Sequence, residues 1–286
     1  MTLSDGRNLE VVEAGKKHWP AIIVHNGTPS GAGLIREHVA DAVARELRII
    51  SYGRPGYGQS TRHPGRSVAS AAEDTAKLAD ALGIERFATW GISGGGPHAL
   101  ACAALLGDRV VAAASLAGVA PYDATGLNFL AGMGEDNVTE FGAAIQGATA
   151  LSAYLEPQVP ALLGQDPEVM AEHMSTLLSG PDREVFTGSF GEQLAQIMQD
   201  SLRTGFFGWL DDDLAFVKSW GFNPSAIKVP VQIWQGEQDL MVPFSHGQWL
   251  AQAIPQADVH LSANDGHLTV WVNRVPEVHA WLSSHF

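Results

Sequence analysis

Short runs of apolar and β-branched residues alternate with longer alanine-rich stretches over the first 120 residues of the chain. The short runs are Leu9–Glu13, Ala21–His25, Leu47–Tyr52, Arg86–Trp90 and Val110–Leu116. The stretches with helical spacing of Ala, Leu and Val are Ile35–Glu46, Val68–Leu82 and Pro97–Leu106. This alternation predicts parallel strands joined by crossover helices, and therefore an α/β fold with a mostly parallel, twisted sheet flanked by helices.

The same alternation returns near the end of the chain. We predict strands at Val231–Gln235 and Asp258–Leu261 and helices at His246–Ile254 and Val270–Leu282. The two α/β blocks, residues 1–120 and 224–286, are therefore expected to form one core domain around a shared sheet.

Residues 121–223 separate the two blocks and contain no convincing β run. Their helical segments are punctuated by Pro157, Pro160, Pro167 and Pro181, so we interpret this stretch as a helical insertion. Ligands of open α/β sheets bind outside the carboxyl ends of the strands. An insertion between strands of one sheet lies over or beside that edge, which predicts a cap, or lid, over the site.

A serine stands at the turn between a predicted strand and a predicted helix. The segment Gly91–Gly95 reads GISGG, the pattern of a nucleophile elbow, in which glycines leave room for the neighbouring strand and helix. The alternative is a glycine-rich phosphate cradle, which would need Gly-Lys-Ser or Gly-Lys-Thr at the helix start. Here the helix starts with Gly96-Pro97-His98, which favours Ser93 as a nucleophile.

A serine hydroxyl is a weak nucleophile near neutral pH, so it needs a base and an acid that orients the base. His267 follows a predicted strand, in a turn with an adjacent glycine, and is our candidate general base. Asp239, in the turn after the preceding strand, is the candidate acid, because an elbow serine is followed along the chain by acid and then histidine. Glu237 and Asp123 remain alternatives for the acid.

Two backbone N–H groups are expected to stabilise the oxyanion of a tetrahedral intermediate. One should come from Gly94, the residue after the nucleophile. The second should come from the glycine-rich loop His25–Gly31, in which the Thr28 amide is our candidate and Gly27 permits the turn. The alternative is a plain βα turn that contributes no donor.

Composition argues against several other classes of function. The net charge is −14 and no basic run exceeds Lys16-Lys17, so we expect no nucleic-acid partner. The longest apolar run, Val110–Ala120, is too short to cross a bilayer, and no signal peptide is recognisable. We therefore expect a cytoplasmic protein without a membrane partner. Cys102 is the only cysteine, which allows no disulfide and no thiolate metal cluster; we predict no cofactor and no metal.

These motifs make the chain resemble the α/β-hydrolase superfamily, in particular the cap-bearing, esterase-like serine hydrolases of bacteria. The segments that carry the resemblance are Asn26–Pro29, Gly53–Ser60, the elbow at Ser93, Trp220–Phe222 with Ile227 and Val229-Pro230, Gly236–Pro243, and Gly266-His267. The resemblance implies an α/β-hydrolase fold with a catalytic triad and an oxyanion hole. Two residues depart from the family pattern near the oxyanion hole: Asn26 replaces the usual histidine, and Gly53 the usual aspartate.

The leading hypothesis is that the protein hydrolyses carboxylic esters or related small acyl compounds through an acyl-enzyme intermediate. A serine in place of an aspartate nucleophile argues against dehalogenase and epoxide-hydrolase chemistry. Lactone opening, carbon–carbon bond hydrolysis, aminopeptidase-like activity and cofactor-free perhydrolysis remain alternatives. A non-catalytic small-molecule binder on the same fold is a further alternative from a different class.

The predicted lid carries two kinds of side chain that bear on the substrate. Its large apolar residues could line a pocket, although they more often form the core of the lid itself. These residues are Phe129, Leu130, Met133, Phe141, Phe206, Phe207, Trp209 and Phe216. Its acidic residues Glu135, Asp136 and Glu140 could receive an amine, although we favour a solvated helix face.

Overall fold

A seven-stranded sheet forms the centre of the protein in a computed structural model that describes all residues 1–286. The strands are β1 (Val11–Ala14), β2 (Ala21–His25), β3 (Arg48–Tyr52), β4 (Phe87–Ile92), β5 (Val110–Leu116), β6 (Val231–Gly236) and β7 (Asp258–Ser262). Their order across the sheet is β1-β3-β2-β4-β5-β6-β7, and all neighbours are parallel except β1 and β3. The predicted α/β class and mostly parallel sheet are confirmed.

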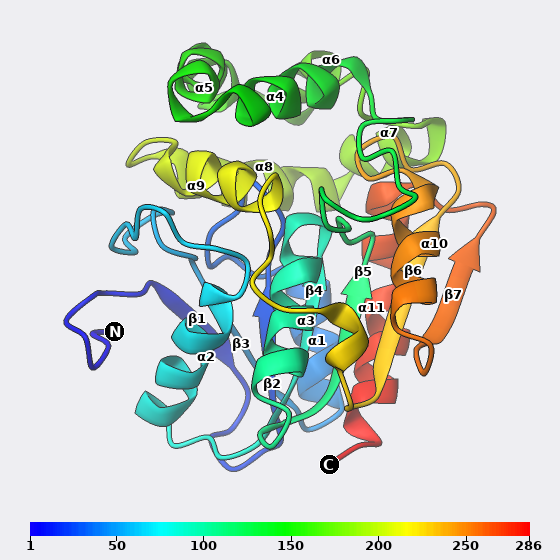
Figure 1. Cartoon of the computed structure of the whole chain (residues 1–286). Coiled ribbons are helices and arrows are strands. Elements are labelled where there is room, and N and C mark those ends of the chain that lie inside the picture. The colour runs from blue at the N-terminus through cyan, green and yellow to red at the C-terminus, as the bar shows by residue number, and fades with distance from the viewer.

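Helices cover both faces of this sheet (Figure 1). They are α1 (Arg36–Ala44), α2 (Ser70–Ala81), α3 (Gly96–Leu105), α10 (Phe244–Ala253) and α11 (His267–Ser283). Helix α11 packs on β4, β5 and β6 and against α1, whereas α3 packs on β2, β4 and β5 and against α2. Strands β2 to β6 are buried along their whole length, as expected for a parallel sheet covered on both faces.

The predicted bounds hold for β2 and β5 and differ by a few residues elsewhere. The first strand begins at Val11 rather than Leu9, because the backbone N–H of Leu9 donates to the carbonyl of Met1 in an N-terminal turn. The last helix begins at His267 rather than Val270, so the predicted base occupies the first position of a helix.

The chain between β5 and β6 forms six helices and no strand of the sheet. They are α4 (Glu135–Gln146), α5 (Ala148–Leu162), α6 (Pro167–His173), α7 (Gly180–Phe186), α8 (Ser189–Leu202) and α9 (Phe207–Phe216). Figure 1 shows them, in green to yellow, stacked above the carboxyl ends of the strands. A short 3₁₀ turn, η2 (Pro224–Ala226), then leads back to the sheet.

The prolines of this segment play two different roles. Pro167 and Pro181 stand in the first turn of α6 and α7, where a missing N–H costs little. Pro157 and Pro160, which we expected to interrupt helices, lie inside α5. That expectation was wrong because both fall near the end of α5, whose apolar side, including Leu155 and Val159, is buried against the rest of the segment.

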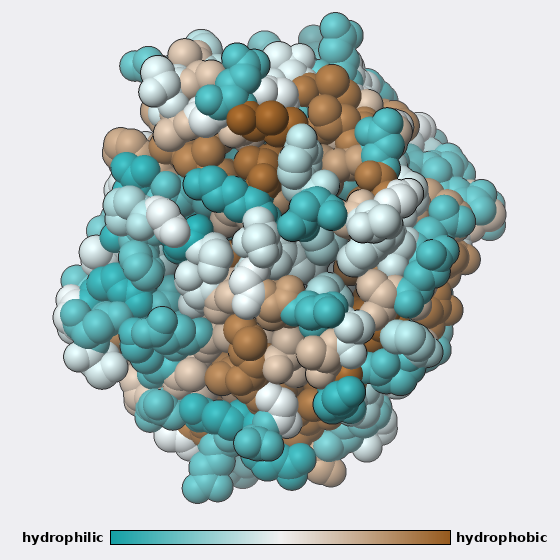
Figure 2. Space-filling view, viewed as in Figure 1, coloured by the Kyte–Doolittle hydropathy of each residue, from teal (hydrophilic) through white to brown (hydrophobic).

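The surface shows where this helical segment exposes apolar side chains. On the face seen in Figure 2, hydrophobic residues gather in the upper part of the molecule, at the height of α4 and α9 in Figure 1. None of the helices combines the length and the apolar character that crossing a bilayer requires.

Candidate active site

Ser93 lies at the tip of a sharp turn between β4 and α3. It opens a 3₁₀ turn, η1 (Ser93–Gly95), and has a φ of 56°, a strained conformation for a residue with a side chain. The flanking glycines explain how the turn fits. A Cβ on Gly95 would overlap the carbonyl oxygen of His25, and one on Gly91 would overlap that of Gly95. The turn therefore depends on the glycines that the sequence places there.

His267 and Asp239 form a buried hydrogen-bonded pair. Nδ1 of His267 lies 2.8 Å from Oδ2 of Asp239, and each residue is 3% exposed. Asp239 Oδ1 accepts hydrogen bonds from the backbone N–H groups of Met241 (2.9 Å) and Val242 (2.8 Å). Oδ2 also accepts one from the side chain of Gln235 at 2.9 Å. With its lone pairs so engaged, the carboxylate holds the imidazole in one orientation, with Nδ1 protonated.

Two opposing effects act on the pKa of His267. Burial alone would lower this pKa, because it disfavours the charged imidazolium. The charge of Asp239 and its hydrogen bond outweigh burial, and the net pKa of His267 is raised above its ordinary value. The imidazole is therefore a stronger base than a free histidine.

The other two candidate acids lie elsewhere. Glu237, in the same turn as Asp239, and Asp123, beyond β5, are both exposed. Neither makes a hydrogen bond to His267, whose ring contacts Asp239 instead. Of the three carboxylates, the structure brings Asp239 together with the histidine.

Ser93, in the turn after β4, and His267, at the start of α11, line one cavity. This smaller cavity is also lined by Gly27, Thr28 and Trp271. No hydrogen bond joins Ser93 to His267 in the structure, and such contacts commonly tighten only when substrate is bound. Ser93 and Thr28 also line a second, larger cavity of about 150 Å³ beneath the helical segment. The serine thus stands where the two cavities meet.

The predicted oxyanion-hole residues are neighbours. A Cβ on Gly94 would overlap the side chain of Thr28, and both residues line the larger cavity. The backbone N–H of Thr28 makes no hydrogen bond within the protein, so it is free to donate to a ligand. The loop is braced by Asn26, whose side-chain amide donates to the carbonyls of Gly31 (2.8 Å) and Gly33 (2.7 Å). Asn26 thus has a structural role at the position where the family usually has histidine.

Asp212, a residue that sequence reasoning missed, ties α9 to this loop. Its buried carboxylate (0% exposed) accepts hydrogen bonds from Thr28 Oγ1 (2.8 Å) and Tyr57 (2.8 Å) and pairs with Arg54 and Arg66, each at 2.6 Å. Arg54 also donates to the carbonyls of Asn26 and Gly27. Burial alone would raise the pKa of Asp212, but the two arginines hold it well below its ordinary range. The carboxylate is therefore ionised and fixes the loop.

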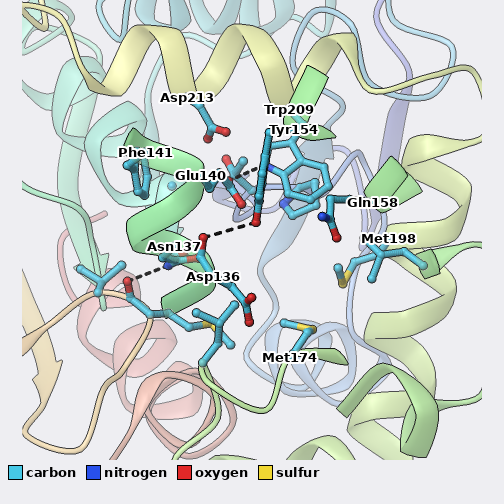
Figure 3. A pocket seen from close by; sticks show the side chains of 18 of the residues that line it. Asp136, Asn137, Glu140, Phe141, Tyr154, Gln158, Met174, Met198, Trp209 and Asp213 are labelled. Carbon is cyan, nitrogen blue, oxygen red and sulfur yellow. Dashed lines mark hydrogen bonds between the residues drawn. The ribbon is translucent and has the colours of Figure 1, made fainter. Parts of the chain in front are cut away.

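The larger cavity is walled by residues of α4, α5 and α9 (Figure 3). Of the apolar lid residues that we singled out, Phe141, Trp209 and Phe216 line it. Phe207 does not: it is 44% exposed and lies under the guanidinium of Arg62. These three aromatic residues contribute apolar surface to the cavity wall.

Acidic residues also face the larger cavity. Glu135 is exposed, but Asp136 and Glu140 line the cavity, and Glu140 is only 9% exposed. Our preference for a solvated face was therefore wrong for Glu140, because α4 turns that side toward the cavity. Asp213 on α9, which the sequence did not single out, lines the same space. No group of three or more His, Cys, Asp or Glu side chains is arranged to hold a metal ion.

Comparisons with known proteins find similarity to hydrolases. The chain is 27% identical to a 2-hydroxy-6-oxononadienedioate/2-hydroxy-6-oxononatrienedioate hydrolase of Burkholderia vietnamiensis, over 94% of this chain and 88% of that enzyme. It is 33% identical to 3-oxoadipate enol-lactonase 1 of Acinetobacter baylyi, over 35% of this chain and 37% of that enzyme.

The fold of this chain is also similar to that of a solved structure. A thermophilic esterase from Thermogutta terrifontis superimposes with a TM-score of 0.67 at 21% identity, covering 100% of this chain and 97% of that one. The model of the alpha/beta hydrolase fold family matches residues 20–274, which include the elbow serine, the buried acid and the histidine. On its sequence and its architecture, the chain belongs to the α/β-hydrolase family.

Proposed function

We propose that this protein hydrolyses carboxylic esters of small molecules through a covalent acyl-enzyme on Ser93. One observation supports this proposal most strongly. His267, whose Nδ1 lies 2.8 Å from Oδ2 of the buried Asp239, lines the same cavity as Ser93, and Ser93 stands in a strained turn. A nucleophile, a base of raised pKa and an acid that orients it are the parts that acyl transfer requires.

The first half of the reaction forms the acyl-enzyme. Ser93 Oγ attacks the ester carbonyl carbon while Nε2 of His267 takes the hydroxyl proton. Asp239 stabilises the resulting imidazolium without itself taking the proton. The C–O bond to the alcohol then breaks, and the alcohol leaves with the proton from His267.

The second half returns the enzyme to its resting state. Water gives a proton to His267 Nε2 and attacks the acyl carbon. The ester bond to Ser93 breaks, the carboxylic acid leaves, and Ser93 regains its proton. In both tetrahedral intermediates the backbone N–H groups of Thr28 and Gly94 donate to the oxyanion, which in other enzymes is worth on the order of 3 kcal/mol per donor.

We assign residues 121–223 the role of a cap over the core domain, residues 1–120 and 224–286. Two observations support this role. Asp212 accepts a hydrogen bond from the Thr28 hydroxyl, and the helical segment supplies most of the residues that line the larger cavity. A cap of this kind excludes water from the reaction and selects the substrate.

Turnover of short-chain p-nitrophenyl esters tests the proposal. We expect the wild-type protein to hydrolyse them and Ser93→Ala to lose turnover while its circular dichroism spectrum stays unchanged. The panel should include a cyclic ester, because a relative is an enol-lactonase and a lactone is opened by the same attack. An active Ser93→Ala protein would overturn the assignment of the nucleophile.

A matched pair of variants tests the acid. Asp239→Asn should lower turnover by a factor on the order of 10⁴, because the amide favours the wrong imidazole tautomer. Asp123→Asn, an exposed carboxylate beyond β5, should leave turnover close to wild type. Equal losses in the two variants would refute the role of Asp239.

A further inference from the structure

Asp213 presents a buried carboxyl group to the larger cavity, and its hydrogen-bonding partner in the protein is another acid, Glu140. The residue is 1% exposed, and no protein group except the neighbouring acid Glu140 is placed to donate a hydrogen bond to its side-chain oxygens. Buried carboxylate oxygens are normally satisfied, since a missing partner costs free energy. Its neighbour Asp212 already binds the two nearby arginines, and neither arginine pairs with Asp213. An unsatisfied acceptor that lines a ligand cavity indicates a donor on the ligand.

Glu140 lies beside Asp213 and faces the same space (Figure 3). One of its oxygens accepts a 2.7 Å hydrogen bond from the indole N–H of Trp209. Glu140 could satisfy Asp213 only by keeping a proton, because both groups are acids. Burial raises the pKa of Asp213 well above its ordinary value, and the charge of Glu140 raises it further; burial raises the pKa of Glu140 as well. Both shifts favour a proton shared by the two carboxyl groups when no ligand is bound, and one shared proton still leaves an oxygen of Asp213 without a donor.

The other residues of the cavity favour a cation over a neutral ligand. Its ionisable lining residues are Asp136, Glu140, Tyr154, His173 and Asp213, and neither lysine nor arginine lines it. Aromatic rings attract cations through their faces, and Trp209 and Phe141 supply such rings. The net charge of −14 also attracts cations toward the protein. Since the acidic residues are not arranged as a metal site, a protonated nitrogen fits them best.

We propose that the larger cavity binds a protonated amine of the substrate, whose N–H groups donate to Asp213 and Glu140 while its ester carbonyl lies at Ser93. This inference rests on the proposed function, since it names the substrate class for that same site. The amine supplies the donors that Asp213 lacks. The ammonium also replaces the proton that the acid pair otherwise shares. That proton passes to water, and each carboxylate then accepts a charge-assisted hydrogen bond from the ammonium.

Two pairs of esters of equal shape test the proposal. In the first pair, the p-nitrophenyl ester of leucine is compared with that of 4-methylpentanoic acid, which lacks only the amine. In the second, 3-(dimethylamino)propyl acetate is compared with 4-methylpentyl acetate, which places the cation on the alcohol side. Measured at a pH of about 6.5, where these amines are mostly protonated, kcat/KM should favour the amine in at least one pair by about tenfold or more.

Variants of the acid pair identify the residues responsible. Asp213→Asn and Glu140→Gln keep the size of each side chain, and each should abolish most of the preference, read as the ratio of kcat/KM between the two esters of a pair. Glu135→Gln is the matched control, since it removes one charge from the exposed side of the same helix. It should keep the wild-type preference. A preference that survives in both acid-pair variants would overturn the assignment.

The outcomes separate this inference from the proposed function. Hydrolysis of the neutral esters without any preference for the amine would refute the amine site and leave the ester hydrolase intact. If no ester is hydrolysed, binding of isoamylamine and isoamyl alcohol is measured by calorimetry. Tighter binding of the amine to wild type than to Asp213→Asn then supports the site without the activity. Equal binding of the amine to both proteins overturns it.

Discussion

The backbone N–H of His267 donates a 2.8 Å hydrogen bond to Oδ2 of Asp182, a fully buried residue of α7. Oδ1 of the same carboxylate accepts from the backbone N–H groups of Leu268 (2.8 Å) and Thr269 (3.0 Å). These N–H groups have no partner within α11, because they belong to its first turn. An acid from the segment between β5 and β6 thus caps the helix that begins with the proposed base.

Replacing Asp182 is predicted to weaken both the fold and the activity. Asp182→Ala leaves three buried N–H groups without an acceptor and removes a favourable charge at the start of α11. We expect a loss of about 1–3 kcal/mol in the free energy of unfolding. We also expect a fall in kcat of about tenfold or more, because His267 loses its fixed position. Urea denaturation and ester turnover measure the two effects.

Asp166→Ala is the control for this variant. Asp166 is the N-cap of α6, but it is exposed and its side chain makes no cap hydrogen bond. Its replacement should change stability by no more than about 0.5 kcal/mol and leave turnover unchanged. If both alanine variants behave alike, the cap formed by Asp182 does not position the histidine.

The pH dependence of activity should report the environment of His267. A protonated imidazole cannot take the proton of Ser93, so activity rises with pH through the pKa of His267. Because Asp239 raises this pKa above its ordinary value, the acid limb of kcat/KM should have its midpoint above about pH 6.5. In Asp239→Asn, burial is opposed only by the smaller effect of the Asp182 charge, and the imidazole titration followed by NMR should move below that value. A midpoint that stays in place would show that Asp239 does not set the pKa.

Gly95 is predicted to tolerate no side chain. A Cβ there would overlap backbone atoms of His25 and Asn26, and backbone cannot move aside as a side chain can. Gly95→Ala should lower the free energy of unfolding by about 1–3 kcal/mol and abolish turnover by displacing Ser93. Gly142→Ala is the control, because a Cβ at that position of α4 meets nothing within 4 Å; it should be stabilising by about 0.5–1 kcal/mol. Thermal denaturation of the two variants tests the contrast.

Asp212→Asn should be among the most destabilising changes of a single carboxylate. It leaves Arg54 and Arg66 buried without a counter-charge, and breaking such a pair costs about 3–5 kcal/mol. The exposed Asp200–Arg203 pair provides the comparison, since Asp200→Asn should cost at most about 1 kcal/mol. A small loss at Asp212, measured by urea denaturation, would show that it does not brace the Thr28 loop.

Local patterns were sufficient to predict most strands of the sheet and the helices that cover it. Strands that are buried on both faces appear in the sequence as continuous apolar runs. At each glycine of the elbow, a Cβ would overlap neighbouring atoms, which explains why glycine stands there. The order of serine, acid and histidine along the chain predicted the hydrogen-bonded pair of Asp239 and His267, and it predicted the serine that lines a cavity together with His267. What these predictions share is that each depends on a few neighbouring residues and on the rule that parallel strands end at one edge.

The helical segment was not predictable in the same way. Asp212 lies 158 residues from Arg54, and Asp182 lies 85 residues from His267, so neither contact leaves a local pattern. An acidic residue on an amphipathic helix is usually solvated, and for this reason Glu140 was misread. Which face of such a helix turns inward is decided by tertiary packing, which a single sequence does not encode in any short motif.

Covalent labelling of Ser93 tests the central claim most directly. The protein is incubated with a fluorophosphonate, its intact mass is measured, and the modified peptide is identified. A single adduct on Ser93, absent from Ser93→Ala and much slower to form in His267→Ala, is the result that we predict. No adduct at high probe concentration, or an adduct on another residue, would contradict the claim that Ser93 is a nucleophile activated by His267.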